Sequence, residues 1–344
     1  MNTAKIVRVH SLGGPEVLKI EELPLVTPKA GEVRIKVQAI GLNRAEVMFR
    51  TGHYLEQPEF PSRIGGEAAG VIDAVGSDVT ELRIGDKVSV ATGQSMGRYG
   101  TYGESAIIPA MSAIRYPDNL TPEEAASIWV QYLTAYFAFV DLAALKPGIS
   151  VLITAATGGA GLGAIQMARV LGATIIATTR STEKKQALLD AGAHHVIITE
   201  KEPLSARVKQ ITKDKGADVI FDPIAGATLP VLAEAVAWGG KIILYGALDG
   251  AETIYPLGTA FARNFSLHAY NLYKLQRPAN YWTFPERRGL LARAQIHFAA
   301  SNSRHAQTNH RKKFSVKPDS SGTFLHGIQP AIGQDCRHYL STII

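Results

Sequence analysis

The sequence predicts a two-domain α/β protein, in which a β-rich, barrel-like domain is followed by a domain with a doubly wound parallel sheet. Three observations support this prediction. The 344 residues exceed the usual size of a single domain. Short apolar runs between turn residues fill the first part of the chain, and strand and helix patterns alternate in the second part. We therefore assign residues 1–125 to the first domain, 126–272 to the second and 273–344 to an atypical tail.

The bulk composition fits a globular protein with a sizeable core, because 46% of the residues are hydrophobic and 19% are charged. The one cysteine, Cys336, excludes an internal disulfide and a zinc site built from cysteines. The first ten residues lack the apolar core of a signal peptide, and no apolar run approaches the ~18 residues of a membrane span. We therefore expect a cytoplasmic protein.

The first domain contains strand patterns separated by turn residues. The strand candidates are Ile6–Val9, Leu18–Ile20, Glu32–Ala39, Gly70–Val75 and Lys87–Val90. Turn sequences such as Leu12-Gly13-Gly14-Pro15 and Gly85-Asp86 separate them. Because several strands precede any long helix, we expect a barrel-like, all-β unit.

The second domain begins with a clear helix signal. Thr121 is a suitable N-cap, Pro122 suits the first helical position, and Glu124 suits the third. The following segment, residues 125–145, is apolar on most faces, so we expect it to be largely buried.

The most informative stretch is residues 150–172, SVLITAATGGAGLGAIQMARVLG. The apolar run Val151–Thr154 predicts a buried parallel strand, a glycine-rich turn follows, and helical spacing begins at Leu162. Strand, glycine turn and helix form the context that a dinucleotide-binding fingerprint requires, with a purely structural turn as the alternative. Small residues at 156, 158 and 161 match G-x-G-x-x-G, with Ala in the first place. We expect the turn and the helix start to hold phosphates through Ala156, Thr157, Gly158, Gly159, Ala160 and Gly161.

The next predicted strand, Ala173–Thr178, leads into residues that select the cofactor. An NAD-binding protein commonly places Asp or Glu at this strand end, and here the end carries none. Arg180 and Lys184 would instead bind a 2′-phosphate, with the Ser181 hydroxyl as a further donor. The sequence therefore predicts NADPH, and the alternative for Lys184 is an exposed first helical turn.

Further alternation completes the sheet. The expected elements are strands at 195–198, 218–222 and 240–244 and helices at 204–214 and 229–237. Ligands of such sheets bind at the carboxyl ends of the strands. We therefore expect the cofactor groove to include Ala225, Gly226, Tyr245, Gly246 and Ala247.

Ordered motifs over about four-fifths of the chain resemble the medium-chain dehydrogenase/reductase family. These motifs are GGPEVL, PKAGEVRIKVQAIGLNRAEVMFRTGHY, GGEAAGVIDAVGSDVT, IGDKV and AATGGAGLG. The resemblance implies a GroES-like domain, a Rossmann domain and an active site in the cleft between them. It also implies a homodimer, because residues 265–273 resemble the strand through which these proteins associate.

Zinc members of the family hold their catalytic metal with a Cys and a His. Here Asn43 stands at the position of that Cys, and Gly66 stands before Glu67 at the position of that His. We therefore expect no metal. The chain resembles the zinc-free branch, which contains quinone oxidoreductases and enoyl reductases.

The zinc-free branch implies roles for three residues. Asn43 and Tyr54 would face the nicotinamide and the substrate, with Tyr54 as a proton donor. Alternatively, Tyr54 only shapes the pocket and Asn43 is a turn residue. Thr134 would lie beside the nicotinamide carboxamide, or else its hydroxyl bonds back to its own helical turn. The other residues considered for the pocket lining are Trp129, Gln131, Tyr132, Tyr255 and Tyr273.

The predicted function is hydride transfer from NADPH to a quinone or an α,β-unsaturated carbonyl, without zinc. The alternatives are a zinc-dependent alcohol dehydrogenase and a non-catalytic NADPH-binding protein. A nucleic-acid partner is disfavoured because the net charge of +6 arises within residues 283–344, which hold nine Lys/Arg and three Asp/Glu.

The tail, 273–344, lacks the helix and the closing strand that a family member would show, and we expect it to be irregular. If the codons are read one nucleotide later, with free choice among synonyms, residues 304–311 and 316–343 can spell a family-like ending. We therefore hypothesise a frameshift that begins near residues 284–295, which the coding DNA tests directly.

Overall fold

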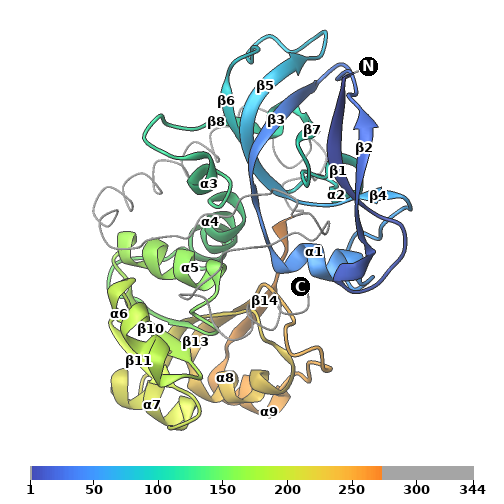
Figure 1. Ribbon diagram of the computed structural model, residues 1–344. Coiled ribbons are helices and arrows are strands. Elements are labelled where there is room, and N and C mark those ends of the chain that lie inside the picture. The colour runs from blue at the N-terminus through green and yellow to red at the C-terminus, as the bar shows by residue number, and fades with distance from the viewer. Residues whose placement is uncertain (1, 273–344) are drawn as a thin grey trace.

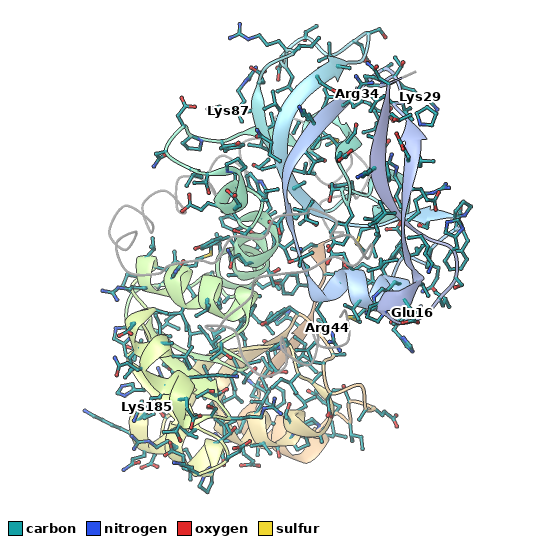
Figure 2. All side chains as sticks on the ribbon, in the orientation of Figure 1. Glu16, Lys29, Arg34, Arg44, Lys87 and Lys185 are labelled. Carbon is teal, nitrogen blue, oxygen red and sulfur yellow. The ribbon has the colours of Figure 1, made fainter. Side chains whose placement is uncertain are left out.

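The computed structural model describes residues 2–272 and places a β-rich unit beside a unit with a parallel sheet (Figure 1). The predictions of an irregular tail and of a frameshift concern residues outside this range. Charged side chains such as Lys87 and Lys185 project outward from the two units (Figure 2). No helix within residues 2–272 is long and apolar enough to cross a membrane.

Two antiparallel sheets build the first unit, with strand orders β2-β1-β4 and β7-β3-β5-β6-β8. The strands are β1 (Thr3–Val9), β2 (Leu18–Pro24), β3 (Glu32–Gly41), β4 (Ser62–Arg63), β5 (Glu67–Val75), β6 (Lys87–Val90), β7 (Ser105–Pro109) and β8 (Ala113–Arg115). All five strand candidates are confirmed, although β4, β7 and β8 were not predicted. The unit also has two short helices, α1 (Arg44–Arg50) and α2 (Met96–Tyr99), so it is not all-β.

The second unit has a six-stranded parallel sheet with the order β11-β10-β9-β12-β13-β14. Its strands are β9 (Ser150–Ile153), β10 (Thr174–Thr179), β11 (His195–Ile198), β12 (Ala217–Asp222), β13 (Val236–Leu244) and β14 (Ser266–Ala269). The strand order reverses between β9 and β12. Such a reversal opens a ligand crevice at the carboxyl ends of the strands, where the predicted cofactor residues lie.

Helices cover this sheet (Figure 1). They are α5 (Gly159–Val170), α6 (Lys185–Asp190), α7 (Leu204–Ile211), α8 (Leu229–Ala235) and α9 (Leu257–Arg263). Because strand side chains alternate between faces, β9 serves two separate cores. Val151 and Ile153 are buried in a cluster with residues of α4 and α5, whereas Leu152 is buried in a cluster with Val208 and Leu232.

The long apolar segment after Thr121 is divided into several pieces. α3 (Pro122–Ala125) starts as predicted, because Thr121 and Glu124 form a capping box. The helix then stops, α4 (Trp129–Tyr136) begins after a three-residue break, and one π-helical stretch, Phe137–Leu142, follows. The break places the first N–H groups of α4 against a buried carboxylate of the β-rich unit, Glu67, which is described below.

Candidate active site

Asn43 and Tyr54 line one hollow of about 370 Å³, although different parts of the chain supply them. Asn43 precedes α1, and Tyr54 lies in the loop after it. Val130 of α4 and Leu272 complete the wall from the second unit. The hollow therefore lies where the two units meet, as expected for a cleft active site. Val130 lines it rather than Trp129, whose indole N–H donates to Ser89 Oγ at 2.8 Å.

Asn43 is held between two buried carboxylates. Its backbone N–H donates to Glu46 Oε2 at 2.8 Å, and its side-chain Nδ2 donates to Glu67 Oε2 at 3.3 Å. Glu46 lies on α1 and also lines the hollow. These contacts fix the Asn43 side chain and so give the hollow a polar edge of defined orientation.

The two carboxylates are buried and receive backbone hydrogen bonds. Glu46 Oε1 accepts from Gly66 N at 3.1 Å, and Glu67 Oε1 accepts from Trp129 N at 2.6 Å and from Val130 N at 3.1 Å. Burial raises the pKa of Glu46 to about 7 and the pKa of Glu67 to about 8, and the backbone donors oppose this rise. Sequence reasoning missed this pair, although Asn43 followed by Glu46 has the N-cap and N3 spacing of a helix start.

Tyr54 is half-buried against the small core around Phe49 and Met96. Burial, assisted by the charges of Glu46 and Glu56, raises the pKa of its phenol to about 12. The phenol therefore stays protonated throughout the neutral range. A group of this kind can donate a hydrogen bond or a proton to an oxygen that gains charge in the hollow.

The glycine turn has the geometry that a dinucleotide requires. α5 begins after Gly158 without a side-chain cap, which leaves its first N–H groups available to phosphate oxygens. Of the residues from 2 to 272, a Cβ added to Gly158 would meet only Ala155 O, at 3.5 Å, so the described chain leaves this side of the turn open. A Cβ on Gly161 would lie 2.7 Å from Ala156 Cα, so α5 and the turn that follows β9 pack too closely there for any side chain. The two glycines therefore differ in their surroundings, and the separate tasks that the fingerprint gives them remain a prediction.

The three residues predicted to bind a 2′-phosphate lie just after β10. Arg180 is exposed, and Lys184 is partly buried in a 3-10 turn, Thr182–Lys184. The Ser181 hydroxyl donates to Glu183, and this hydrogen bond lowers the pKa of the Glu183 carboxyl. Ser181 would have to exchange this partner for a phosphate. The sequence alone gives no sign that Glu183 competes for the Ser181 hydroxyl.

The turn after β12 is organised by Asp222, another residue missed from the sequence. Asp222 is fully buried; its Oδ2 accepts from Ile224 N at 3.0 Å and from Ala225 N at 2.7 Å, and its Oδ1 accepts from the Thr154 hydroxyl. These bonds hold Ala225 at a φ of 57°, a left-handed conformation that costs free energy for a residue with a side chain. Strained backbone of this kind is concentrated at ligand-binding turns, where the surrounding structure maintains it.

The loop after β13 packs against this turn. A Cβ on Gly246 would lie 2.8 Å from Pro223 O, and a Cβ on Gly226 would lie 1.9 Å from Asp249 Oδ2. The Tyr245 ring stacks on Phe221 with centroids 4.1 Å apart, and Ala247 is exposed. The five predicted groove residues are thus brought to one edge of the sheet by two adjoining loops.

Thr134 makes a hydrogen bond within its own helical turn, which is one of the two alternatives expected for it. Its hydroxyl donates to Val130 O at 2.5 Å, one turn earlier in α4. The Thr134 carbonyl in turn accepts a hydrogen bond from the Tyr270 hydroxyl. A contact between Thr134 and a nicotinamide remains a prediction.

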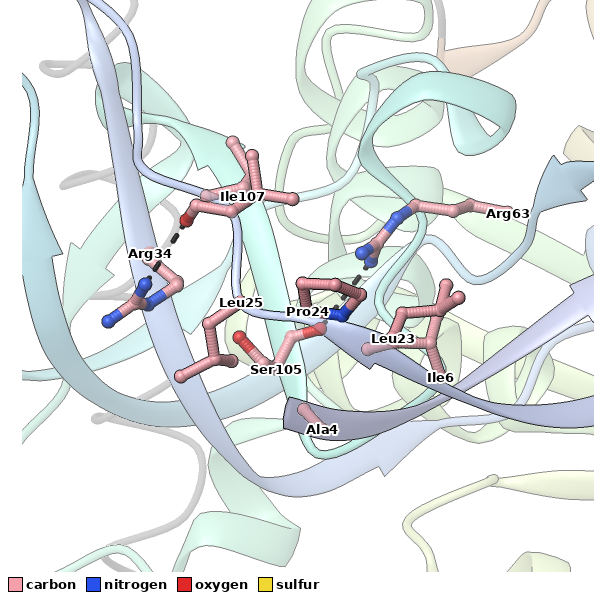
Figure 3. A pocket seen from close by; sticks show the side chains of 10 residues that line it. Ala4, Ile6, Leu23, Pro24, Leu25, Arg34, Arg63, Ser105 and Ile107 are labelled. Atoms are coloured by element: carbon pink, nitrogen blue, oxygen red, sulfur yellow. Dashed lines mark hydrogen bonds between the residues drawn. The ribbon is translucent and has the colours of Figure 1, made fainter. Parts of the chain in front are cut away.

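A second hollow, of about 220 Å³, lies in the β-rich unit and is lined by residues of β1, β2, β3, β4 and β7 (Figure 3). Its wall is largely apolar, with two arginines that donate to backbone oxygens: Arg34 to Val26 O and Arg63 to Ser105 O. It holds none of the predicted catalytic or cofactor residues. The hollow between the two units is therefore the candidate active site.

Comparison with known proteins agrees with this architecture. The family model described as an alcohol dehydrogenase GroES-like domain matches residues 29–118, and the one described as a zinc-binding dehydrogenase matches residues 159–285. Human quinone oxidoreductase is 35% identical over 256 residues, which are 74% of this chain and 76% of that protein. Quinone oxidoreductase of Pseudomonas aeruginosa is 34% identical over 74% of this chain and 77% of its own length.

Solved structures give the same result. Escherichia coli quinone oxidoreductase complexed with NADPH superposes with a TM-score of 0.76 at 30% identity, covering 86% of this chain and 88% of that one. A mycobacterial protein complexed with NADPH superposes with a TM-score of 0.78 at 30% identity, covering 89% and 90%. A GroES-like unit joined to a Rossmann unit defines a class of two-domain dehydrogenases. This chain belongs to the medium-chain dehydrogenase/reductase family, in its quinone oxidoreductase-like group, so the predicted fold class, family and oxidoreductase activity are confirmed.

Proposed function

We propose that this chain is a cytoplasmic, NADPH-dependent oxidoreductase that transfers hydride to a quinone or to the β-carbon of an α,β-unsaturated carbonyl, without zinc. One observation carries the choice of site: Asn43 and Tyr54 line a single hollow that residues of the nucleotide-binding unit complete. The two structural relatives described above were solved with NADPH, in agreement with the cofactor predicted from the sequence.

The residues present fit NADPH. The open side of Gly158 and the uncapped start of α5 would receive the pyrophosphate, and Arg180 and Lys184 would pair with the 2′-phosphate. When bound, NADPH supplies the hydride and so the difficult part of the chemistry. The protein's own contribution is to orient the acceptor and to exclude water from a hollow between two domains.

Within the hollow, Asn43 orients the acceptor carbonyl and Tyr54 supplies a proton. The Asn43 side chain is fixed by Glu67 and so costs little ordering on binding. The Tyr54 phenol is protonated at neutral pH because its pKa is about 12. A reduced quinone can take its proton from water, so this donor matters most for an enone.

The side chains at the site favour a metal-free reaction. The positions that hold zinc in related enzymes carry the amide of Asn43 and the bare backbone of Gly66, which are poor zinc ligands. Within residues 2–272, no group of three or more His, Cys, Asp and Glu side chains is placed to bind a metal ion. We therefore propose that activity survives treatment with a chelator.

A homodimer is also proposed, through the edge of the parallel sheet. Among the strands within residues 2–272, β14 is the outermost of this sheet, and its Ser266 and Ala269 are exposed. An unpaired strand edge is a ready template for a second copy. Light scattering of the purified protein measures the mass and tests this directly.

The central experiment follows the loss of NADPH absorbance with p-benzoquinone and with an enone as separate acceptors. Turnover with either acceptor, retained after EDTA treatment and without bound zinc, supports the proposal. Stoichiometric zinc together with loss of activity on chelation favours a zinc-dependent alcohol dehydrogenase instead. Tight NADPH binding without turnover of any acceptor favours a non-catalytic NADPH-binding protein.

A further inference from the structure

Gln94, beside the predicted catalytic residues, has a buried amide oxygen without a hydrogen-bond partner among residues 2–272. The residue is 9% exposed and lines the same hollow as Asn43 and Tyr54. Its Oε1 accepts no hydrogen bond from any residue in the described part of the chain, 2–272. Such an atom is uncommon, because a buried acceptor that has lost its water and gained no donor is costly in free energy.

The other end of the same amide is only weakly held. Gln94 Nε2 donates to Gly66 O at 3.5 Å, which is the long limit of a hydrogen bond. Gly66 also lines the hollow. The terminal torsion of a glutamine is soft, so the amide can turn its oxygen toward a ligand at little cost.

The groups around this oxygen indicate what kind of ligand it would accept. Glu46 and Asn43 are tied to neighbouring groups, since Glu46 accepts from Gly66 N and the Asn43 amide donates to Glu67. The Gln94 oxygen can only accept, so its partner must bring an O–H or an N–H. A plain quinone or a simple enone carries acceptor oxygens only and leaves the Gln94 oxygen unsatisfied.

We propose that Gln94 is a specificity-determining residue, and that the hollow selects electrophilic carbonyl acceptors carrying a hydroxyl or N–H donor that binds to Gln94 Oε1. This inference rests on the proposed function and adds the substrate class to it. An acceptor with such a donor supplies the hydrogen bond that Gln94 Oε1 lacks within residues 2–272. A site arranged in this way favours the ligand with the donor over the same ligand without it.

The test compares two acceptors of nearly equal size, hydroxymethyl-p-benzoquinone and ethyl-p-benzoquinone. We expect wild-type kcat/KM to be roughly 10-fold higher for the hydroxymethyl compound, which is the effect of one neutral hydrogen bond. Gln94→Met keeps the volume and removes the acceptor, so the preference should fall to about one. Met96→Leu, which changes a neighbouring wall of the same hollow without polar atoms, should keep it.

The two proposals fail in different ways. Reduction of ethyl-p-benzoquinone by the wild type tests the proposed function, whereas the ratio between the two quinones tests the role of Gln94. A wild-type ratio near one, or a ratio that Gln94→Met leaves unchanged, overturns the inference. If neither quinone is reduced, the role of Gln94 is tested by the dissociation constants of both quinones for the NADP⁺-loaded protein. The wild type should then bind the hydroxymethyl compound about 10-fold more tightly, and Gln94→Met should lose this preference.

Discussion

The backbone N–H of Trp129 donates to Glu67 Oε1 at 2.6 Å, so a carboxylate from β5 occupies the start of α4. Val130 N donates to the same oxygen at 3.1 Å. Helix starts need acceptors for their free N–H groups, and side chains usually supply them from the residue just before the helix. Here the acceptor comes from the other unit. The contact therefore links the β-rich unit to the first long helix of the nucleotide-binding unit, next to the hollow.

Removal of the Glu67 carboxylate should destabilise the protein. Glu67→Ala leaves the Trp129 and Val130 N–H groups buried without an acceptor, so we expect a loss of about 2–4 kcal/mol in the free energy of unfolding. Urea denaturation measures this loss. Glu200→Ala, at an exposed position, is the matched control and should change the value by less than about 0.5 kcal/mol. Equal stability of the two variants would contradict a capping role for Glu67.

Stability should fall as the pH rises through neutrality. The carboxyl pKa values are about 7 for Glu46 and about 8 for Glu67 in the folded state, against 4.5 for an unperturbed Glu, so the folded protein binds more protons than the unfolded chain between these values. The stabilisation that these two carboxyl groups give to the folded state is complete below about pH 4.5 and is lost as the pH rises to about 8. We expect the melting temperature to drop by several degrees from about pH 5 to about pH 9.

Glu67→Gln isolates one of the two groups, because a glutamine cannot ionise. The melting temperature of this variant should decline less steeply with pH than that of the wild type, especially between about pH 7 and about pH 9. This expectation holds whether the variant is more or less stable than the wild type. If the wild-type melting temperature instead rises over the same pH range, the two carboxyl pKa values are not raised in the folded state.

Two glycines of the fingerprint should affect different properties when changed to alanine, one the stability of the protein and the other its affinity for NADPH. Gly161→Ala places a Cβ 2.7 Å from Ala156 Cα, so the expected result is a loss of about 1–3 kcal/mol in stability. Gly158 has an ordinary φ of −74° and open space, so Gly158→Ala should fold normally and lose roughly 10-fold or more in NADPH affinity. Denaturation and NADPH titration of both variants separate the two effects. A stable Gly161→Ala protein, or unchanged NADPH binding by Gly158→Ala, would contradict the assigned tasks.

Local signals predicted much of this architecture, whereas contacts between distant residues were not predictable from one sequence. The helix start at Thr121 and the fingerprint turn are encoded within a few residues, and the structure has both. The break before α4 depends on Glu67, which lies 62 residues away from Trp129 in the chain. Apolar periodicity alone therefore predicted a buried segment after Thr121 but not where its helices begin and end.

The candidate site shows the same division. The resemblance of a local segment to the zinc-free branch of the family predicts roles for Asn43 and Tyr54, and the structure brings both residues to one hollow. Asp222 and Gln94 were not selected, because an acid at a strand end and a glutamine in a loop are unremarkable until their surroundings are known. Burial makes both informative: Asp222 is fully buried and holds the backbone of a turn, and Gln94 has an oxygen without a partner in the described chain.

Cofactor preference should depend on Lys184 and not on its neighbour. Lys184→Ala removes a cation that would pair with the 2′-phosphate, so we expect roughly a 10-fold rise in KM for NADPH and little change for NADH. Lys185, which projects into solvent at the start of α6, provides the control through Lys185→Ala (Figure 2). Equal effects of the two variants, or an equal effect on both cofactors, would show that Lys184 does not recognise the phosphate.

The role of Tyr54 is tested by comparing an enone with a quinone. After hydride reaches the β-carbon of an enone, the enolate needs a proton at its α-carbon, and general acid catalysis by a positioned group contributes about 10²–10⁴-fold. Tyr54→Phe removes this proton and keeps the ring that packs near Phe49 and Met96. We therefore expect kcat for the enone to fall about 100-fold. Quinone reduction should change by less than about 3-fold, because water can protonate the reduced product.

A second readout separates proton donation from pocket shape. In deuterated water, the wild type should deliver deuterium to one face of the enone α-carbon, whereas Tyr54→Phe should label both faces, since bulk solvent then supplies the proton. The high pKa of Tyr54, about 12, predicts wild-type enone activity without a loss from phenol ionisation up to about pH 10. Tyr99→Phe is the control, because its hydroxyl donates to Glu32 in the β-rich unit and does not line the hollow. Full enone activity with one-faced labelling in Tyr54→Phe would remove Tyr54 from the reaction and leave water, or another group in the hollow, as the proton source.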